Sequence, residues 1–193
     1  YLRCLQRLKT NAIRTVSSEA LAKAAGVKST QLRKDLTYFG QFGTRGLGYD
    51  VEQLVQMISD LLGTNSLQPV VLVGVGNLGR ALLSYRGFGQ EGFEVIAAFD
   101  LKPINALNKT VTQPVYSMEK LAEVVEKNKR GVKMAIITVP ATEAQEVSNT
   151  LVALGITGIL NFSPIVLDTP EDVTVNNVNL AMELENLSYF IQH

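Results

Sequence analysis

Residues 70–79 read Val-Val-Leu-Val-Gly-Val-Gly-Asn-Leu-Gly, and this stretch decides the fold. Its β-branched and apolar half predicts a buried strand, its three glycines predict a tight turn, and the residues that follow predict a helix. A second apolar run, 95–99, ends in Asp100, twenty-one residues beyond Gly79. This order of strand, glycine turn, helix, strand and acid is typical of a dinucleotide-binding unit.

Each glycine of this stretch has a predicted task. Gly74 allows the turn out of the strand, Gly76 leaves room for a pyrophosphate, and Gly79 lets the helix approach the sheet. The pyrophosphate is expected at the helix start, where backbone N–H groups are free. Asp100 is expected to bind the ribose next to adenine, which favours NAD over NADP, although Lys102 weakens this preference. The residues predicted to bind this half of the nucleotide are Gly74, Val75, Gly76, Asn77, Leu78, Gly79, Asp100, Leu101 and Lys102.

Alternating strand and helix patterns continue beyond Asp100 and predict an α/β fold with a doubly wound parallel sheet. Strands are expected at 134–139, 158–162 and 173–178, and helices at 117–129 and 142–153. Such sheets bind ligands beyond the carboxyl ends of their strands. The residues expected there, around the nicotinamide half, are Thr138, Val139, Pro140, Asn161, Phe162 and Ser163.

The same residues leave three alternatives open. One is a Rossmann domain that binds coenzyme A, which shares the glycine turn but does not require Asp100. Another is a DNA-binding protein whose nucleotide site is vestigial. A dehydrogenase needs an acid or base beside its substrate. The only histidine is His193 and the only cysteine is Cys4. No Tyr-x-x-x-Lys pair is expected in this chain either, so we expect no enzyme.

The composition indicates a folded protein, since 46% of its 193 residues are apolar. No apolar run has membrane-spanning length and no signal peptide is visible. The single cysteine, Cys4, excludes an internal disulfide and a cysteine metal cluster. We therefore expect a cytoplasmic protein with no membrane partner and no metal. Tyr1 is not a natural start, so further residues are expected before it.

The net charge is zero, but the charges are unevenly distributed. Residues 1–49 contain nine Lys or Arg against two Asp or Glu, whereas residues 50–193 contain nine against sixteen. A basic segment joined to an acidic one is typical of a nucleic-acid-binding module on a second domain. A chance distribution of the charges is the alternative.

Residues 1–49 also have the pattern of a helix-turn-helix module followed by a hairpin. Helices are predicted over 1–9, 19–25 and 31–39, capped by Ser17 or Ser18 and by Ser29 or Thr30. The Gly-rich segment 41–49 predicts a small wing with Arg45 near its tip. Another helix is predicted over 50–62 and a linker over 63–68.

The third helix divides into two faces. Leu32, Leu36 and Phe39 recur at helical spacing and are expected to pack inward. The other face carries donors, acceptors and cations that suit a major groove, although they equally suit a solvated helix. The residues predicted to contact DNA are Ser17, Ser18, Ser29, Thr30, Gln31, Arg33, Lys34, Thr37, Tyr38, Arg45 and Tyr49.

Residues 181–191 predict a helix that is apolar around most of its circumference. Met182, Leu184, Leu187, Tyr189 and Phe190 cannot all pack against one surface of the same chain. We therefore expect this helix to be buried between two subunits.

The sequence resembles a known family, the Rex family of redox-sensing repressors. The likeness runs from Tyr1 to His193. Its most specific pieces are Arg-Lys-Asp-Leu-Thr-Tyr-Phe-Gly at 33–40, Gly-Leu-Gly-Tyr-Asp at 46–50, the glycine motif at 74–79, Thr-Val-Pro at 138–140 and Gly-Ile-Leu-Asn-Phe-Ser-Pro at 158–164.

The resemblance implies a homodimer that binds a palindromic operator and is released when NADH closes the dimer, while NAD competes without closing it. It implies a winged-helix DNA-binding domain at 1–62, a Rossmann NAD(H)-binding domain at 63–180 and a swapped dimerisation helix at 181–193. Family members usually carry an Asp before the last helix that pairs with positions matching Arg3 and Tyr85. Here that place holds Asn179, which would weaken the contact and blunt the redox switch. Leu180 would be the apolar residue that covers the partner's nicotinamide.

Overall fold

The computed structural model describes residues 1–38, 40, 43, 48–102 and 113–192 and separates into two compact units, Tyr1–Ser66 and Leu67–His193. Most of the predicted wing, including Arg45, lies outside the described residues, as do Phe39, residues 103–112 and His193. Among the described helices none has the length and apolar character needed to cross a membrane.

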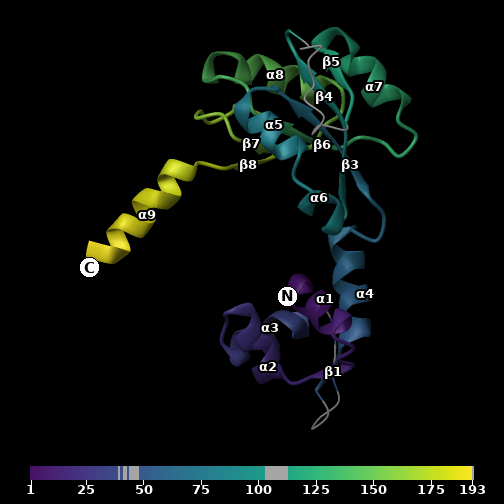
Figure 1. Ribbon diagram of the computed structural model, residues 1–193, viewed down its shortest axis with the longest axis vertical. Helices are drawn as coiled ribbons and strands as arrows, with labels where there is room; N and C mark the ends of the chain where they lie inside the picture. Colours follow the sequence, from purple (N-terminus) through teal and green to yellow (C-terminus); the bar gives the residue numbers. More distant parts are fainter. Residues whose placement is uncertain (39, 41–42, 44–47, 103–112, 193) are drawn as a thin grey trace. The chain divides into compact units, whose positions relative to one another are not determined.

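The first unit is mostly helical (Figure 1). Ser17 begins its second helix, because its hydroxyl accepts a hydrogen bond from the Ala20 N–H at 3.1 Å, and Gly26 ends that helix. Asp50 begins the fourth helix in the same way, through the Gln53 N–H at 2.8 Å. The helices are α1 (Leu2–Thr10), α2 (Ser18–Ala25), α3 (Ser29–Tyr38) and α4 (Val51–Leu62), and β1 (Thr15–Val16) pairs antiparallel with β2 (Tyr49–Asp50).

The core of this unit is built from the apolar spacing of its helices. Leu5, Leu21, Leu32 and Leu54 are almost fully buried, and Leu36 joins them. The inward face predicted for α3 is therefore confirmed for its two described leucines. Because α3 already begins at Ser29, both Ser29 and Thr30 lie in its first turn, and neither is the predicted cap outside the helix.

The second unit contains a six-stranded sheet in the order β5-β4-β3-β6-β7-β8, with every pair parallel. The predicted α/β class is confirmed. Val73 at the end of β3 pairs with Phe99 of β4 and Ile137 of β6, so the carboxyl ends of the three strands are level. The chain order reverses between β3 and β6, which is where such sheets bind ligands. The strands are β3 (Gln68–Val73), β4 (Phe93–Asp100), β5 (Val115–Ser117), β6 (Met134–Ile137), β7 (Gly158–Asn161) and β8 (Thr174–Asn177).

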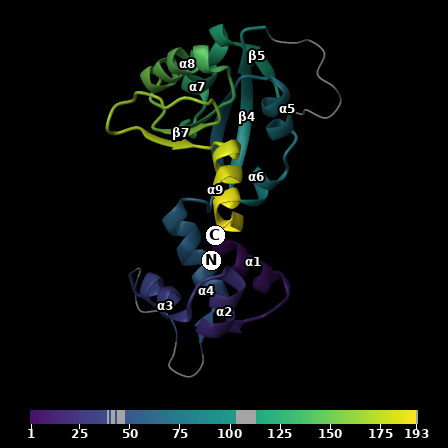
Figure 2. The ribbon, with the colours of Figure 1, turned by 90° about the vertical axis from the view of Figure 1, so that its left-hand side faces the viewer.

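Helices cover both faces of this sheet (Figure 2). Val71 and Val73 pack on the face covered by α7 and α8, and Val70 and Leu72 pack on the opposite face, toward α5 and α6. This alternation explains why β3 is apolar from Pro69 to Val73. The helices are α5 (Asn77–Leu83), α6 (Gly87–Gln90), the 3₁₀ helix η1 (Met118–Lys120), α7 (Leu121–Lys127), α8 (Ala141–Ala153) and α9 (Leu180–Gln192).

Two predicted elements are clearly shorter than expected, and one short helix was not predicted. The helix expected over 117–129 is shorter, because Ser117 ends β5 and its hydroxyl caps η1 through the Glu119 N–H. The strand expected over 134–139 ends at Ile137, since Thr138 turns toward the glycine loop. The short helix α6 was not predicted, because two of its four residues are glycines and the rest show no helical period.

Helix α9 contributes no residue to the hydrophobic cores formed by the described part of the chain. Every residue from Leu180 to Ile191 is exposed, and Leu184, Phe190 and Ile191 retain 67, 75 and 83% of their accessible surface. The helix begins at Asn179, whose side-chain oxygen accepts hydrogen bonds from the Ala181 and Met182 N–H groups at 3.0 and 3.2 Å. A helix that is apolar and exposed all round needs a covering surface from elsewhere.

Candidate nucleotide site and nucleic-acid interface

The glycine turn after β3 is held tightly against β6. Gly74 adopts a φ of 99°, and a Cβ there would lie 2.7 Å from the Thr138 carbonyl carbon. The Thr138 hydroxyl donates to the Gly74 carbonyl at 2.6 Å and to the Val73 carbonyl at 3.2 Å. A Cβ on Gly79 would collide with the Gly74 carbonyl oxygen. Both glycines therefore have the packing tasks that the motif predicts.

Gly76 differs from these two glycines. A Cβ at Gly76 would meet no protein atom within 4 Å, so the fold itself leaves this position free of steric demand. Gly76 is the residue before α5, whose first N–H groups lack acceptors within the helix. The open space above Gly76 and the free donors at the helix start together suit an anionic group such as a pyrophosphate.

Asp100 is oriented by the backbone around it. Its carboxylate accepts hydrogen bonds from the Val75 N–H at 2.7 Å and from the Lys102 N–H at 3.0 Å, one on each oxygen. Each carboxylate oxygen has a second lone pair, so the group can still accept the hydroxyls of a ribose. The predicted acid is thus fixed at the end of β4 with spare acceptor capacity.

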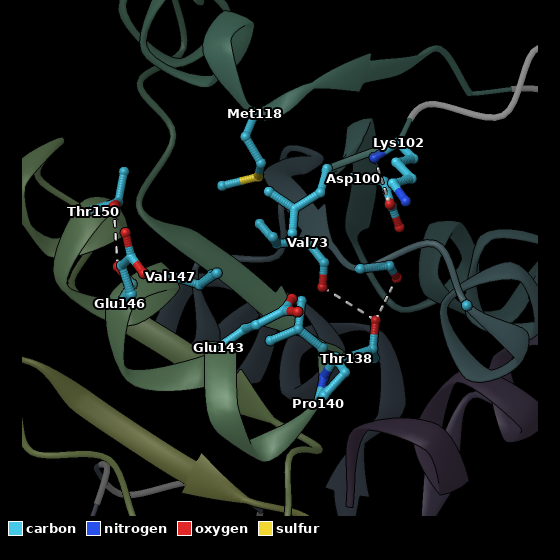
Figure 3. A pocket seen from close by; sticks show the side chains of 14 residues that line it. Val73, Asp100, Lys102, Met118, Thr138, Pro140, Glu143, Glu146, Val147 and Thr150 are labelled. Carbon is cyan, nitrogen blue, oxygen red and sulfur yellow. Dashed lines mark hydrogen bonds between the residues drawn. The ribbon is translucent and has the colours of Figure 1, made fainter.

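A cavity of about 600 Å³ lies at the carboxyl ends of β3, β4 and β6 (Figure 3). Its size is within the range of small-molecule and cofactor sites. Eight predicted residues line it: Gly74, Gly76, Asp100, Leu101, Lys102, Thr138, Val139 and Pro140. Six lining residues were not predicted: Val73, Met118, Glu143, Glu146, Val147 and Thr150. The last four share one face of α8 at helical spacing, and that spacing after Pro140 could have revealed them.

Three residues expected near the nicotinamide are not among those that line this cavity. Asn161 is fully buried, and its amide donates to the Ser163 and Ile165 carbonyls and to Asn177 Oδ1. The Ser163 hydroxyl donates to the Val139 carbonyl at 2.6 Å. Phe162 packs against the core on the α5 side of the sheet. Their observed role is to order the chain after β7, because their polar atoms are already paired within the protein.

The other predicted nucleotide residues lie elsewhere as well. Val75 is buried and Gly79 packs against the turn, whereas Asn77 and Leu78 lie in the first turn of α5 on the exposed side. Tyr85 stacks edge-to-face on Phe88 and lines a second cavity of about 510 Å³ together with Arg86 and Gln113. Leu180 is 63% exposed at the start of α9. The structure does not bring Tyr85 or Leu180 to the first cavity.

One sequence expectation is wrong. Tyr116 is followed by Lys120, which is the Tyr-x-x-x-Lys spacing that we did not expect in this chain. The Lys120 ammonium lies 5.5 Å from the centroid of the Tyr116 ring, and Tyr116 packs against Phe99. Neither residue lines the nucleotide cavity. The pair makes a cation–π contact at the sheet edge, so it does not supply an acid and base to this cavity.

The outward face of α3 is polar and accessible. Thr30, Gln31, Arg33, Lys34, Thr37 and Tyr38 are all exposed, and Ser29 is partly exposed. The Arg33 guanidinium bonds back to Ser29, and the Thr37 hydroxyl donates to the Arg33 carbonyl. Lys34 extends from this face with an ammonium that is able to reach a phosphate or a base edge.

Asp35 fastens α3 to the first helix. Its carboxylate accepts the Tyr1 hydroxyl at 2.6 Å and the Gln31 amide at 2.6 Å. Burial, together with this carboxylate, raises the pKa of Tyr1 to about 12. The bond from Tyr1 restrains one side of α3, and the bond from Gln31 pairs that side chain within the helix.

Three predicted DNA contacts have other partners in the structure. Tyr49 is only 9% exposed, because it packs in the core beside Val16, so it is not available as a groove contact. The Ser17 hydroxyl caps α2, and Ser18 bonds to Glu19.

Comparison with known families agrees with two modules. Residues 1–37 match a family described as the N-terminus of putative DNA-binding proteins. Residues 65–165 match a family described as a CoA binding domain. The second description names coenzyme A, the alternative ligand that the glycine motif left open. The matched residues include the glycine turn and Asp100.

Full-length relatives and solved structures are more specific. The chain is 47% identical to the redox-sensing transcriptional repressor Rex of Pelotomaculum thermopropionicum, over 98% of this chain and 88% of that protein. It is 48% identical to Rex of Streptomyces coelicolor, over all of this chain and 74% of that protein. A crystal structure of RSP in complex with NAD⁺ and operator DNA superposes with a TM-score of 0.87 and 34% identity, covering 99% of this chain and 87% of that one. The crystal structure of RSP in complex with NADH superposes with a TM-score of 0.83, covering 99% of this chain and 88% of that one.

Proposed function

The chain belongs to the Rex family of redox-sensing transcriptional repressors, and we propose that it binds operator DNA in the cytoplasm and releases that DNA when NADH fills the cavity above the glycine turn. The match to RSP, whose structures hold NAD⁺ with operator DNA and NADH, carries this proposal. The relatives are transcriptional repressors and not enzymes. The resemblance read from the motifs is thus confirmed.

The described residues fit a dinucleotide. Gly76 offers an open approach for the pyrophosphate, and Asp100 retains acceptors for the adenine-side ribose. Pro140 and Val139 line the cavity beyond the glycine turn, toward the nicotinamide half in this proposal. When bound, the nicotinamide ring supplies the redox signal, because its oxidised form carries a positive charge that its reduced form lacks. NADH shifts the protein between two states only through a difference in its affinity for them.

The DNA-binding domain in this proposal is a winged helix over 1–62, with α3 as the recognition helix. Support comes from the excess of basic residues in 1–49 and from the exposed polar face of α3. The β1–β2 pair forms the base from which a wing carrying Arg45 would extend. Lys34, Arg33 and Thr37 are the contacts that we propose for the major groove and its phosphates.

The assembly in this proposal is a homodimer on a palindromic operator. The Rossmann domain spans 63–180, and helix 181–193 crosses to the partner subunit. The exposed apolar side chains of α9, none of which joins a described hydrophobic core, support this arrangement. A two-fold dimer matches a two-fold site because each subunit binds one half-site.

The deciding experiment is a fluorescence anisotropy titration with a palindromic duplex selected from a random library by the protein itself. NADH is expected to release the duplex, and NAD⁺ is expected to raise the NADH concentration that is needed. If the protein binds the duplex and NADH does not release it, the protein is a repressor with a vestigial nucleotide site. Failure to bind any duplex would refute the assignment.

Lys34→Ala is expected to weaken operator binding by about tenfold, because an ion-paired contact to a phosphate is lost. The slope of log affinity against log salt concentration should also become shallower by about one. Lys129→Ala is the matched control, since Lys129 is an exposed lysine in the sheet unit. Equal affinities for both variants across the salt series would remove Lys34 from the DNA face.

Asn179→Asp is expected to lower the NADH concentration for half-maximal release by about fivefold, because a carboxylate forms stronger hydrogen bonds than a neutral amide. Aspartate also caps helices, so the bonds to Ala181 and Met182 should be retained. Asn176→Asp adds the same charge nearby on exposed β8 and serves as the control. A release curve identical to that of the unaltered chain would show that Asn179 does not blunt the switch.

A further inference from the structure

The nucleotide cavity has apolar side chains near Asp100. Val73, Leu101, Met118 and Val147 are among its lining residues, and Val147 comes from α8 (Figure 3). Apolar side chains beside the ribose-binding acid suit the base of a nucleotide whose ribose is held by Asp100. What selects among bases must then be a polar group that lines the cavity.

Glu143 is that group. It lies in the first turn of α8 and is partly buried, and its side chain is directed into the cavity. In Figure 3, Met118 lies on one side of Val73 and Glu143 on the other. No hydrogen bond or ion pair to the Glu143 carboxylate occurs within the described part of the chain. Glu146, one turn further, is exposed at the outer end of the cavity near Thr150.

The chemistry of a carboxylate restricts what it can recognise. An ionised carboxylate only accepts hydrogen bonds, and adenine has a single exocyclic donor, its 6-amino group. We propose that Glu143 is a specificity residue of the nucleotide site and that its carboxylate accepts a hydrogen bond from the adenine 6-amino group. A purine with an oxygen at position 6 would place an acceptor against the carboxylate, which is repulsive. This proposal rests on the proposed function, since it assumes that the cavity binds NADH.

The test compares NADH with its reduced hypoxanthine analogue, which has an oxygen in place of the 6-amino group. Binding is followed directly by fluorescence of the reduced nicotinamide. The unaltered chain is expected to favour NADH by about tenfold or more, as for a charge-assisted bond. In Glu143→Gln the preference should fall to about twofold or less, since a glutamine amide can both donate and accept. Glu126→Gln, which changes an exposed residue of α7 that does not line the cavity, is the matched control and should retain the full preference.

The outcomes separate the two proposals. An unchanged preference in Glu143→Gln would overturn the assignment of Glu143. So would a Glu143→Gln variant that gains affinity for NADPH but keeps its base preference, because the carboxylate would then face the ribose. If the unaltered chain binds neither nucleotide, the proposed NADH site itself fails. Melting temperatures of the three proteins are expected to agree, since no hydrogen bond or ion pair joins the Glu143 carboxylate to another described residue.

Discussion

Gly76→Leu is expected to lower NADH affinity by about 100-fold or more, while melting temperature and operator affinity stay within experimental error of the unaltered chain. The fold makes no use of the missing Cβ at this position, because a Cβ there meets no protein atom within 4 Å. A leucine would fill the space in which the pyrophosphate is expected to approach the start of α5. A loss of 100-fold corresponds to about 2.7 kcal/mol, which is less than the energy of an unrelieved clash with a rigid ligand. Fluorescence titration and calorimetry measure the two effects separately.

Gly79→Ala provides the contrast within the same motif. A Cβ at Gly79 would collide with the Gly74 carbonyl, so this variant should lose roughly 1–3 kcal/mol of stability and weaken NADH binding only through that damage. If Gly76→Leu lost as much stability as Gly79→Ala, its weaker NADH binding would be explained by damage to the fold and not by a blocked pyrophosphate site. NADH affinity preserved in a folded Gly76→Leu protein would mean that the nucleotide does not cross the glycine turn.

If the proposed dimer forms through α9, removing residues 180–193 should convert it into a monomer and lower affinity for a palindromic duplex by about 100-fold or more. The loss follows because two linked half-site contacts become independent. Since no residue of α9 belongs to a hydrophobic core of the described residues, its removal should leave those cores intact. Light scattering gives the oligomeric state, and anisotropy with full and half palindromes gives the affinities.

Substitutions within α9 test the same surface without deletion. Leu184→Glu combined with Leu187→Glu should also produce a monomer, because two charges are placed on the apolar helix. Glu183→Gln combined with Glu185→Gln changes the same helix without removing apolar surface, so it should remain a dimer. A truncated protein that stays dimeric would assign the subunit contact to another surface.

Short sequence patterns were sufficient to predict those parts of the fold that are determined by residues close together in the sequence. The glycine spacing at 74–79 predicted the turn because Gly74 and Gly79 meet backbone atoms wherever this motif folds. The apolar runs predicted the central parallel strands β3 and β6 because these are buried on both faces. Asp100 was found because it directly ends a strand.

Other features depend on contacts that no local pattern contains. Asn161 and Ser163 follow a strand, as ligand-binding residues do, yet their polar atoms pair with Asn177, Ile165 and Val139. Tyr49 reads as an exposed residue beside a wing, but pairing of β1 with β2 buries it. Glu143 was overlooked because a carboxylate in the first turn of a helix is ordinarily a capping preference, and only the cavity reveals where it is directed.

The hydroxyl of Thr138 bonds to both carbonyls of the glycine turn, so the cradle for the pyrophosphate is preformed by a neighbouring strand. A preformed cradle contributes the same free energy to the oxidised and the reduced nucleotide, and that contribution cancels from their affinity ratio. Evolution can therefore strengthen or weaken the cradle to match the size of the cellular nucleotide pool without altering the ratio at which the protein responds. The set point must reside in groups that contact the nicotinamide ring.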